Sequence, residues 1–104
     1  MKVNRKYVKS AEPFFKALLK NPEVRIAYEE EKAKSEIAMA VRAARLRAHL
    51  TQAKLAEKVG TTQSVIARLE SGSDKRIPTL PLLAQIAAAC NGSLEVGFKF
   101  KHAV

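Results

Sequence analysis

Three polar residues at the start of a predicted helix are of types that suit contacts with the edges of base pairs. Gln63 and Ser64 directly follow Thr62, a good helix cap, and Arg68 lies about one turn further along. Such side chains contribute little to a hydrophobic core. The run TTQSVIARLESG is therefore consistent with a helix that contacts DNA, but solvated polar positions on a surface helix would give the same pattern, and the rest of the chain must decide between the two.

The overall charge of the chain is consistent with a polyanionic partner. The 104 residues include 19 Lys and Arg against 10 Asp and Glu, which gives a formal net charge of +9 at pH 7. A positive surface potential attracts nucleic acid, the commonest polyanion inside cells. Charge alone would equally permit binding to RNA, DNA or anionic lipid.

Residues that could support catalysis or metal binding are few and scattered. Cys90 is the single cysteine, and its apolar surroundings IAAAC predict a buried small side chain rather than a reactive thiol. The two histidines, His49 and His102, are far apart in the sequence. We therefore expect no enzyme activity, no metal site and no cofactor, since no nucleophile, base and metal set can be assembled.

The chain is expected to be soluble and cytoplasmic. One cysteine cannot form an internal disulfide, which fits a reducing compartment. No window reaches the roughly 18 apolar residues of a membrane span. The basic segment MKVNRKYVKS is not followed by the hydrophobic core of a signal peptide.

Length and composition favour a single, mainly α-helical domain with short appendages. Hydrophobic residues make up 47% of the chain and aromatic residues 6%, and much of the apolar fraction is alanine. Apolar periodicity predicts helices over residues 13–20, 22–34, 35–50, 52–59, 63–71 and 79–90. Asn21, Thr51 and Thr62 are the expected caps of three of them. Gly60 and Gly72 are expected to end two of them.

The C-terminal segment shows the period of a β-strand. In SLEVGFKFK the apolar residues alternate with polar or small ones; they are Leu94, Val96, Phe98 and Phe100. A lone strand needs a partner for its backbone hydrogen bonds. It could pair with residues 1–12, a short strand or loose arm, or with the same strand of a second chain. We favour the second arrangement, because symmetric dimers are the commonest oligomers.

Two short helices joined at Gly60 make a helix-turn-helix, in which the second helix lies in the major groove of DNA. The run LTQAKLAEKVGTTQSVIARLESG resembles the helix-turn-helix of the lambdoid phage repressors and Cro, within the xenobiotic-response-element-like family. This resemblance extends over residues 37–91. It implies a lambda-repressor-like helical bundle.

The resemblance also implies roles for individual residues. It places Gln63, Ser64 and Arg68 at base-contacting positions, where the amide of Gln63 would pair with adenine. The residues that it places at the DNA backbone are Gln52, Thr62, Lys75 and Arg76. Arg45 and Glu70 match a buried ion pair that supports the fold in some of these proteins.

The segments that flank the helix-turn-helix, NPEVRIAYEEEKAKSEIAMAVRAAR and GSLEVGFKF, resemble HigA-type antitoxins. Such proteins pair with small ribonuclease toxins of the RelE-like fold. The resemblance implies a type II antitoxin that binds operator DNA as a homodimer, represses its own operon and neutralises a RelE/HigB-like toxin. Because such toxins are basic, an acidic, partly apolar patch would suit them. The candidate residues for this patch are Tyr28, Glu29, Glu30 and Glu31.

These assignments divide the chain into three parts. Residues 1–34 hold the N-terminal arm and helices with the candidate toxin-binding patch, residues 35–92 form the DNA-binding domain, and residues 93–104 form the dimerisation strand. The basic N-terminal arm departs from the logic of an acidic neutralising surface. Two other functions stay open: a phage-type or host repressor without a toxin, and a toxin-neutralising protein with only weak DNA binding.

Overall fold

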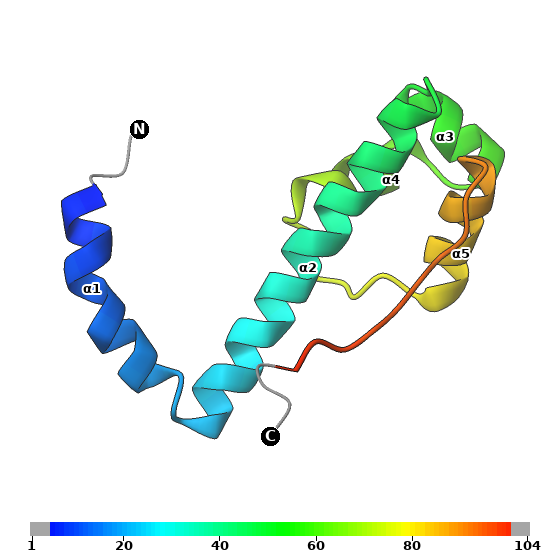
Figure 1. Ribbon diagram of the computed structural model, residues 1–104. Coiled ribbons are helices and arrows are strands. Elements are labelled where there is room, and N and C mark those ends of the chain that lie inside the picture. Colours follow the sequence, from blue (N-terminus) through cyan, green and yellow to red (C-terminus); the bar gives the residue numbers. More distant parts are fainter. Residues whose placement is uncertain (1–4, 101–104) are drawn as a thin grey trace. The chain divides into compact units, whose positions relative to one another are not determined.

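The computed structural model describes residues 5–100, with side chains described from residue 11 onward (Figure 1). Within these residues the chain forms five α-helices: α1 (Arg5–Leu18), α2 (Pro22–Arg47), α3 (Gln52–Val59), α4 (Gln63–Ser71) and α5 (Leu80–Ala89). The chain divides into two compact units, Met1–Ser35 and Glu36–Val104. The expected mainly helical architecture is confirmed.

The first two helices are longer than their sequence pattern predicts. Helix α1 already begins at Arg5, so the segment predicted as a short strand or loose arm is helical from that residue, and Pro13 lies inside the helix. At this interior position the proline leaves one backbone hydrogen bond of the helix unmade, and its ring crowds the carbonyl oxygen four residues earlier, which is why sequence reasoning places proline at a helix start instead. Helix α2 runs through Ser35, where two separate helices were expected. A serine lowers helix propensity far less than glycine or proline, so the helix continues.

The start of α2 follows the predicted cap. The side-chain oxygen Oδ1 of Asn21 accepts a hydrogen bond from the backbone N–H of Glu23 at 3.0 Å. Pro22 occupies the first helical position, where its missing N–H costs nothing. The two residues together define where this 26-residue helix begins.

The ends of α3 and α4 are fixed by local chemistry, as expected. The hydroxyl groups of Thr51 and Thr62 each accept a hydrogen bond from the backbone N–H three residues later, at 3.0 Å and 3.3 Å. Gly60 and Gly72 follow the two helices with φ angles of 82° and 70°, in the left-handed region that glycine tolerates best. The turn between the two helices is therefore encoded by its own residues.

A small apolar core holds the second unit together. Its buried residues come from α2 to α5 and are Ala38, Val41, Leu55, Ala56, Ile66, Leu69 and Ile86. Leu55 of α3 and Ile66 of α4 are 0% exposed, and α3 packs against both α4 and α5. Burial of each such side chain stabilises the fold by about 1.5–3 kcal/mol. This core therefore fixes the angle between the two helices of the helix-turn-helix.

Cys90 closes α5. Its backbone N–H donates to the carbonyl oxygen of Ile86 at 3.1 Å, and its side chain is half-buried. Burial raises the pKa of the thiol. Cys90 was expected to be buried and is only half-buried, but the raised pKa of its thiol fits the expectation that it is not a reactive thiol.

The C-terminal strand predicted over residues 93–104 is not a strand in the part that the structure describes. Residues 93–100 continue irregularly after α5, without the ladder of a β-sheet (Figure 1). A strand requires a neighbouring strand, and the amino-terminal partner considered above is helical from Arg5. The prediction that residues 93–100 pair as a strand within the chain is therefore wrong. Pairing with a second chain stays a prediction, and residues 101–104 lie outside the described residues.

Apolar side chains of this C-terminal segment lie mostly in solvent. Leu94 is 38% exposed and helps to line an apolar groove between α2 and α5, whereas Val96, Phe98 and Phe100 are 77%, 88% and 85% exposed. Large apolar side chains in such numbers on one segment are typical of an interaction surface. In the described part of the chain, no helix has the length and apolar character to cross a membrane.

Candidate nucleic-acid interface

Helix α4 separates a buried face from an exposed polar face. Ile66 and Leu69 point into the core, and Gln63, Ser64 and Arg68 are exposed on the other side. The helical repeat produces this separation, because residues three or four apart share one face. The three residues predicted to contact bases thus lie on one free helical surface.

The side chain of Arg68 lies back along α4. Its Nε donates to the backbone carbonyl oxygen of Ser64 at 3.3 Å, and its own carbonyl oxygen accepts from the hydroxyl of Ser71 at 2.8 Å. The first bond brings the guanidinium group toward the N-terminal end of the helix. A planar fork of donors beside Ser64 is well suited to acceptors on base edges or phosphates.

The ion pair between Arg45 of α2 and Glu70 of α4 is present in the structure. Arg45 donates from Nε to Glu70 Oε2 at 2.7 Å and from Nη2 to Oε1 at 2.9 Å, and the two side chains are 11% and 4% exposed. Such a bidentate, charge-assisted pair is stronger than a neutral hydrogen bond. It joins the end of α2 to the end of α4.

The pair shifts the pKa of both partners. The hydrogen bond with Glu70 raises the pKa of Arg45. For Glu70, burial acts to raise the pKa of the carboxyl group, but the hydrogen bonds from Arg45 and Gln52 outweigh it, and the pKa is lowered. Both groups are therefore held in their charged forms.

Gln52, predicted to contact the DNA backbone, is half-buried at the first position of α3. Its amide Nε2 donates to Glu70 Oε1 at 3.3 Å. Arg45 also donates from Nη1 to the carbonyl oxygen of Leu50 at 2.9 Å, just before α3. The contact between Gln52 and the ion pair was not predicted from the sequence. No spacing signals it, because the residues come from three different helices.

The loop after α4 carries the other two predicted backbone contacts, Lys75 and Arg76, and both are exposed. The carboxylate of Asp74 shapes this loop by accepting a hydrogen bond from the backbone N–H of Arg76 at 3.0 Å. It also lies 3.7 Å from Nε of Arg76. Asp74 was not predicted as part of the site, although an aspartate that bonds the backbone two residues on is a common turn signal.

The candidate toxin-binding residues lie in the first unit, on α2. Glu29, Glu30 and Glu31 are exposed, and Glu31 forms an ion pair with Lys34 at 3.4 Å. The ring of Tyr28 packs edge-on against Phe15 of α1, with centroids 5.4 Å apart. The patch thus combines an aromatic pair with exposed carboxylates.

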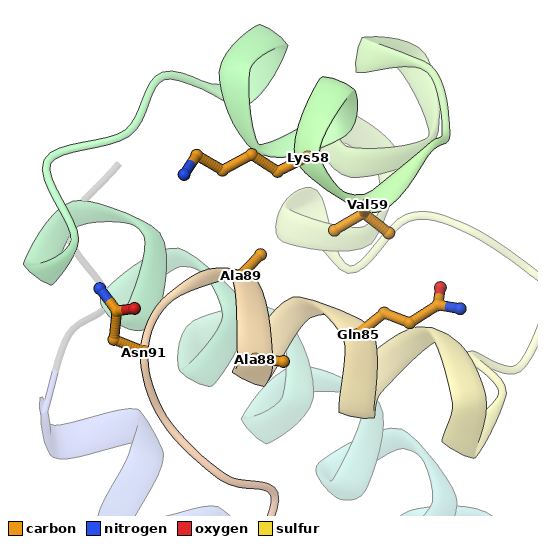
Figure 2. Close-up of a pocket in the computed structure, with 6 residues that line it drawn as sticks. All are labelled: Lys58, Val59, Gln85, Ala88, Ala89 and Asn91. Atoms are coloured by element: carbon orange, nitrogen blue, oxygen red, sulfur yellow. The ribbon is translucent and has the colours of Figure 1, made fainter.

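A shallow hollow between α3 and α5 is lined by other residues. Figure 2 shows Lys58 and Val59 on one side and Gln85, Ala88, Ala89 and Asn91 on the other. None of the residues predicted to contact DNA lines it. It is therefore separate from the candidate interface.

Comparison with known families agrees with this geometry. The model of the helix-turn-helix family matches residues 41–96, more than half of the chain, and the match includes α3, α4 and α5. No solved structure gives a significant match.

Proposed function

The chain belongs to the helix-turn-helix family of the phage-repressor type, whose members are DNA-binding transcriptional regulators, and on this premise we propose that it is the antitoxin of a type II toxin–antitoxin system. In this role it binds operator DNA as a homodimer, represses its own operon and neutralises a RelE-like ribonuclease toxin. The observation that carries the DNA-binding part is the exposed face of α4 with Gln63, Ser64 and Arg68.

DNA binding uses two kinds of contact. Helix α4 enters the major groove, where Gln63 pairs with adenine and Ser64 and Arg68 contact neighbouring base edges. Residues around the helix approach the phosphates; they are Gln52, Thr62, Lys75 and Arg76. The net charge of +9 supports this arrangement, because neutralised phosphates release counterions.

Dimerisation uses the C-terminal segment. The exposure of Val96, Phe98 and Phe100 supports this role, because a second chain would remove three large apolar side chains from water. Antiparallel pairing of two such segments would also complete backbone hydrogen bonds that one chain cannot make.

Toxin neutralisation uses the first unit. Large apolar side chains are exposed there, with Phe14 at 69% and Ile26 at 60%, and the carboxylates of Glu29 and Glu30 are exposed on the same unit as the Phe15–Tyr28 pair. A basic ribonuclease could bury apolar side chains against this unit and pair its positive charges with these carboxylates.

The alternative is a phage-type or host repressor without a toxin. One observation favours it: the family match begins at residue 41 and so covers none of the first unit. The two functions differ in what the first unit does, so an experiment on that unit separates them.

The deciding experiment is co-expression with any small basic RelE-like protein encoded beside this gene. If the proposal holds, that protein alone arrests growth, and this chain restores growth. A charge-reversed variant, Glu29→Lys with Glu30→Lys, is expected to lose the rescue while still binding a DNA duplex selected by the unmodified chain from a random pool. Rescue that is unchanged in this variant would remove these residues from the toxin interface. Failure of the unmodified chain to restore growth would leave the repressor alternative.

A further inference from the structure

The carboxylate of Glu70 serves two partners at once. Its Oε2 accepts from Arg45 Nε at 2.7 Å, and its Oε1 accepts both from Arg45 Nη2 at 2.9 Å and from Gln52 Nε2 at 3.3 Å. The Glu70 side chain is 4% exposed. Both oxygens therefore face protein donors rather than bulk water, and Gln52 is part of the same network as the ion pair.

The contact fixes which way the Gln52 amide faces. With the opposite orientation, its carbonyl oxygen would lie against a carboxylate oxygen, and two acceptors repel each other. The amide group has two N–H hydrogens, and the bond to Glu70 uses one of them. The second hydrogen stays available for a phosphate oxygen, on a side chain whose rotation is already restricted.

We propose that Glu70 is a positioning residue for DNA binding: it holds the amide of Gln52, at the start of α3, ready to donate to a phosphate. This inference rests on the proposed DNA-binding function and extends it. One carboxylate then links the helix that contacts bases to the residue that contacts the backbone. The positions of α3 and α4 on the duplex are thereby coupled, and Glu70 has a role beyond the ion pair with Arg45.

Arg45 strengthens the same arrangement from the other side. Its Nη1 donates to the carbonyl oxygen of Leu50 at 2.9 Å, two residues before Gln52. The guanidinium group therefore supports the chain that leads into α3 while it balances the charge of Glu70. Without that balance, a carboxylate beside a phosphate contact would repel DNA.

The test is a double-mutant cycle of DNA affinity that combines Gln52→Ala with Glu70→Ala. Affinity for a short fluorescein-labelled duplex of random sequence is measured by anisotropy, so that only backbone contacts count. Glu70→Ala is expected to weaken binding about 3- to 10-fold when Gln52 is present, the size of one hydrogen bond. In the Gln52→Ala background the same substitution should leave the affinity unchanged.

Two further variants keep the test independent of folding. Circular dichroism establishes that each variant is folded at the temperature of the titration. If Glu70→Ala is not, Glu70→Asp keeps a charge for Arg45 and withdraws the carboxylate from Gln52, and the same coupling is expected. The control is Lys54→Ala on the same turn of α3, whose side chain is 56% exposed and pairs with Glu57. Its cycle with Glu70→Ala should be additive.

A loss of affinity that is equal with and without Gln52 would overturn the positioning role, because Glu70 would then act through the fold alone. Coupling of the same size to Lys54 would overturn it as well. A different result, failure of the unmodified chain to bind any duplex, would refute the DNA-binding function itself and the inference with it.

Discussion

Gln63 and Lys75 represent the two kinds of DNA contact at the scale of single residues. Replacing Gln63 with alanine should weaken binding to the selected operator by about 1–3 kcal/mol and leave binding to a scrambled duplex nearly unchanged, because its amide contacts a base. Replacing Lys75 should weaken both duplexes and reduce the salt dependence. Titrations on both duplexes at several salt concentrations measure this. Equal losses on the two duplexes for Gln63→Ala would exclude base contact.

Glu70 gives the fold a dependence on acid pH. Its pKa is lowered from 4.5 in the folded chain, so the unfolded chain binds more protons as the pH falls through this range. The stabilisation is complete above pH 4.5 and is lost as the pH falls through the folded-state pKa. The stability advantage of the unmodified chain over Glu70→Gln should therefore shrink on acidification. Chemical unfolding of both proteins across this range tests this; a constant difference would contradict it.

At the scale of elements, the turn between α3 and α4 depends on Gly60. Its φ of 82° lies in the left-handed region, and nothing within 4 Å would meet a Cβ atom, so strain alone opposes a side chain. Gly60→Ala should destabilise the chain by about 1–2 kcal/mol. Gly60→Asn should cost less, because asparagine adopts this conformation more readily. Thermal unfolding of the three proteins gives the comparison, and an alanine variant as stable as the original would show that the turn relaxes.

The elements differ in how far the sequence alone predicts them. The limits of α3 and α4 were predictable because each is set by a residue next to the helix end. The threonines Thr51 and Thr62 cap the starts, and the glycines Gly60 and Gly72 follow the ends. The extent of α1 was not predictable. Proline is frequent in the first turn of a helix and rare in the interior, so Pro13 was expected to mark the start of this helix. Residues 93–100 carry the alternation of a strand, but strand formation depends on a partner that the pattern cannot specify.

In the candidate site, too, features set by neighbouring residues could be predicted and contacts between distant residues could not. The exposed face of α4 follows from the helical repeat, which a sequence displays directly. The bond between Gln52 and Glu70 depends on how α3 and α4 pack around Leu55 and Ile66, and no local pattern contains that information. The exposed polar face of α4 could therefore be predicted, whereas the hydrogen bond between Gln52 and Glu70 was found only in the structure.

At the scale of the whole molecule, removal of residues 93–104 should convert the proposed dimer into a weak dimer or a monomer and leave the helices folded. These residues carry Val96, Phe98 and Phe100, which are largely exposed in the single chain, and the seven core residues all precede them. Two recognition helices must be held about 34 Å apart to reach successive major grooves, so tight operator binding should be lost as well. Light scattering, circular dichroism and operator titration of the shortened chain measure the three effects.

A shortened chain that is still dimeric and binds with unchanged affinity would place the dimer contact on the helices instead. The matched control is Phe98→Ala with Phe100→Ala in the full chain. It keeps the backbone available for pairing while it removes most of the apolar area, and should weaken dimerisation about as much as the truncation if burial of these rings drives association.

The half-buried thiol of Cys90 allows the opening of the last turn of α5 to be followed by the rate of its alkylation. Only the thiolate attacks alkylating reagents, and burial, by raising the pKa of this thiol, keeps that form scarce while the helix end is closed. Labelling then proceeds through brief openings of the last turn, so its rate reports their free energy. Because α5 leads directly into residues 93–100, a partner chain that binds there would slow the labelling. The rate at which Cys90 is alkylated is thus a kinetic measure of association that needs no introduced cysteine.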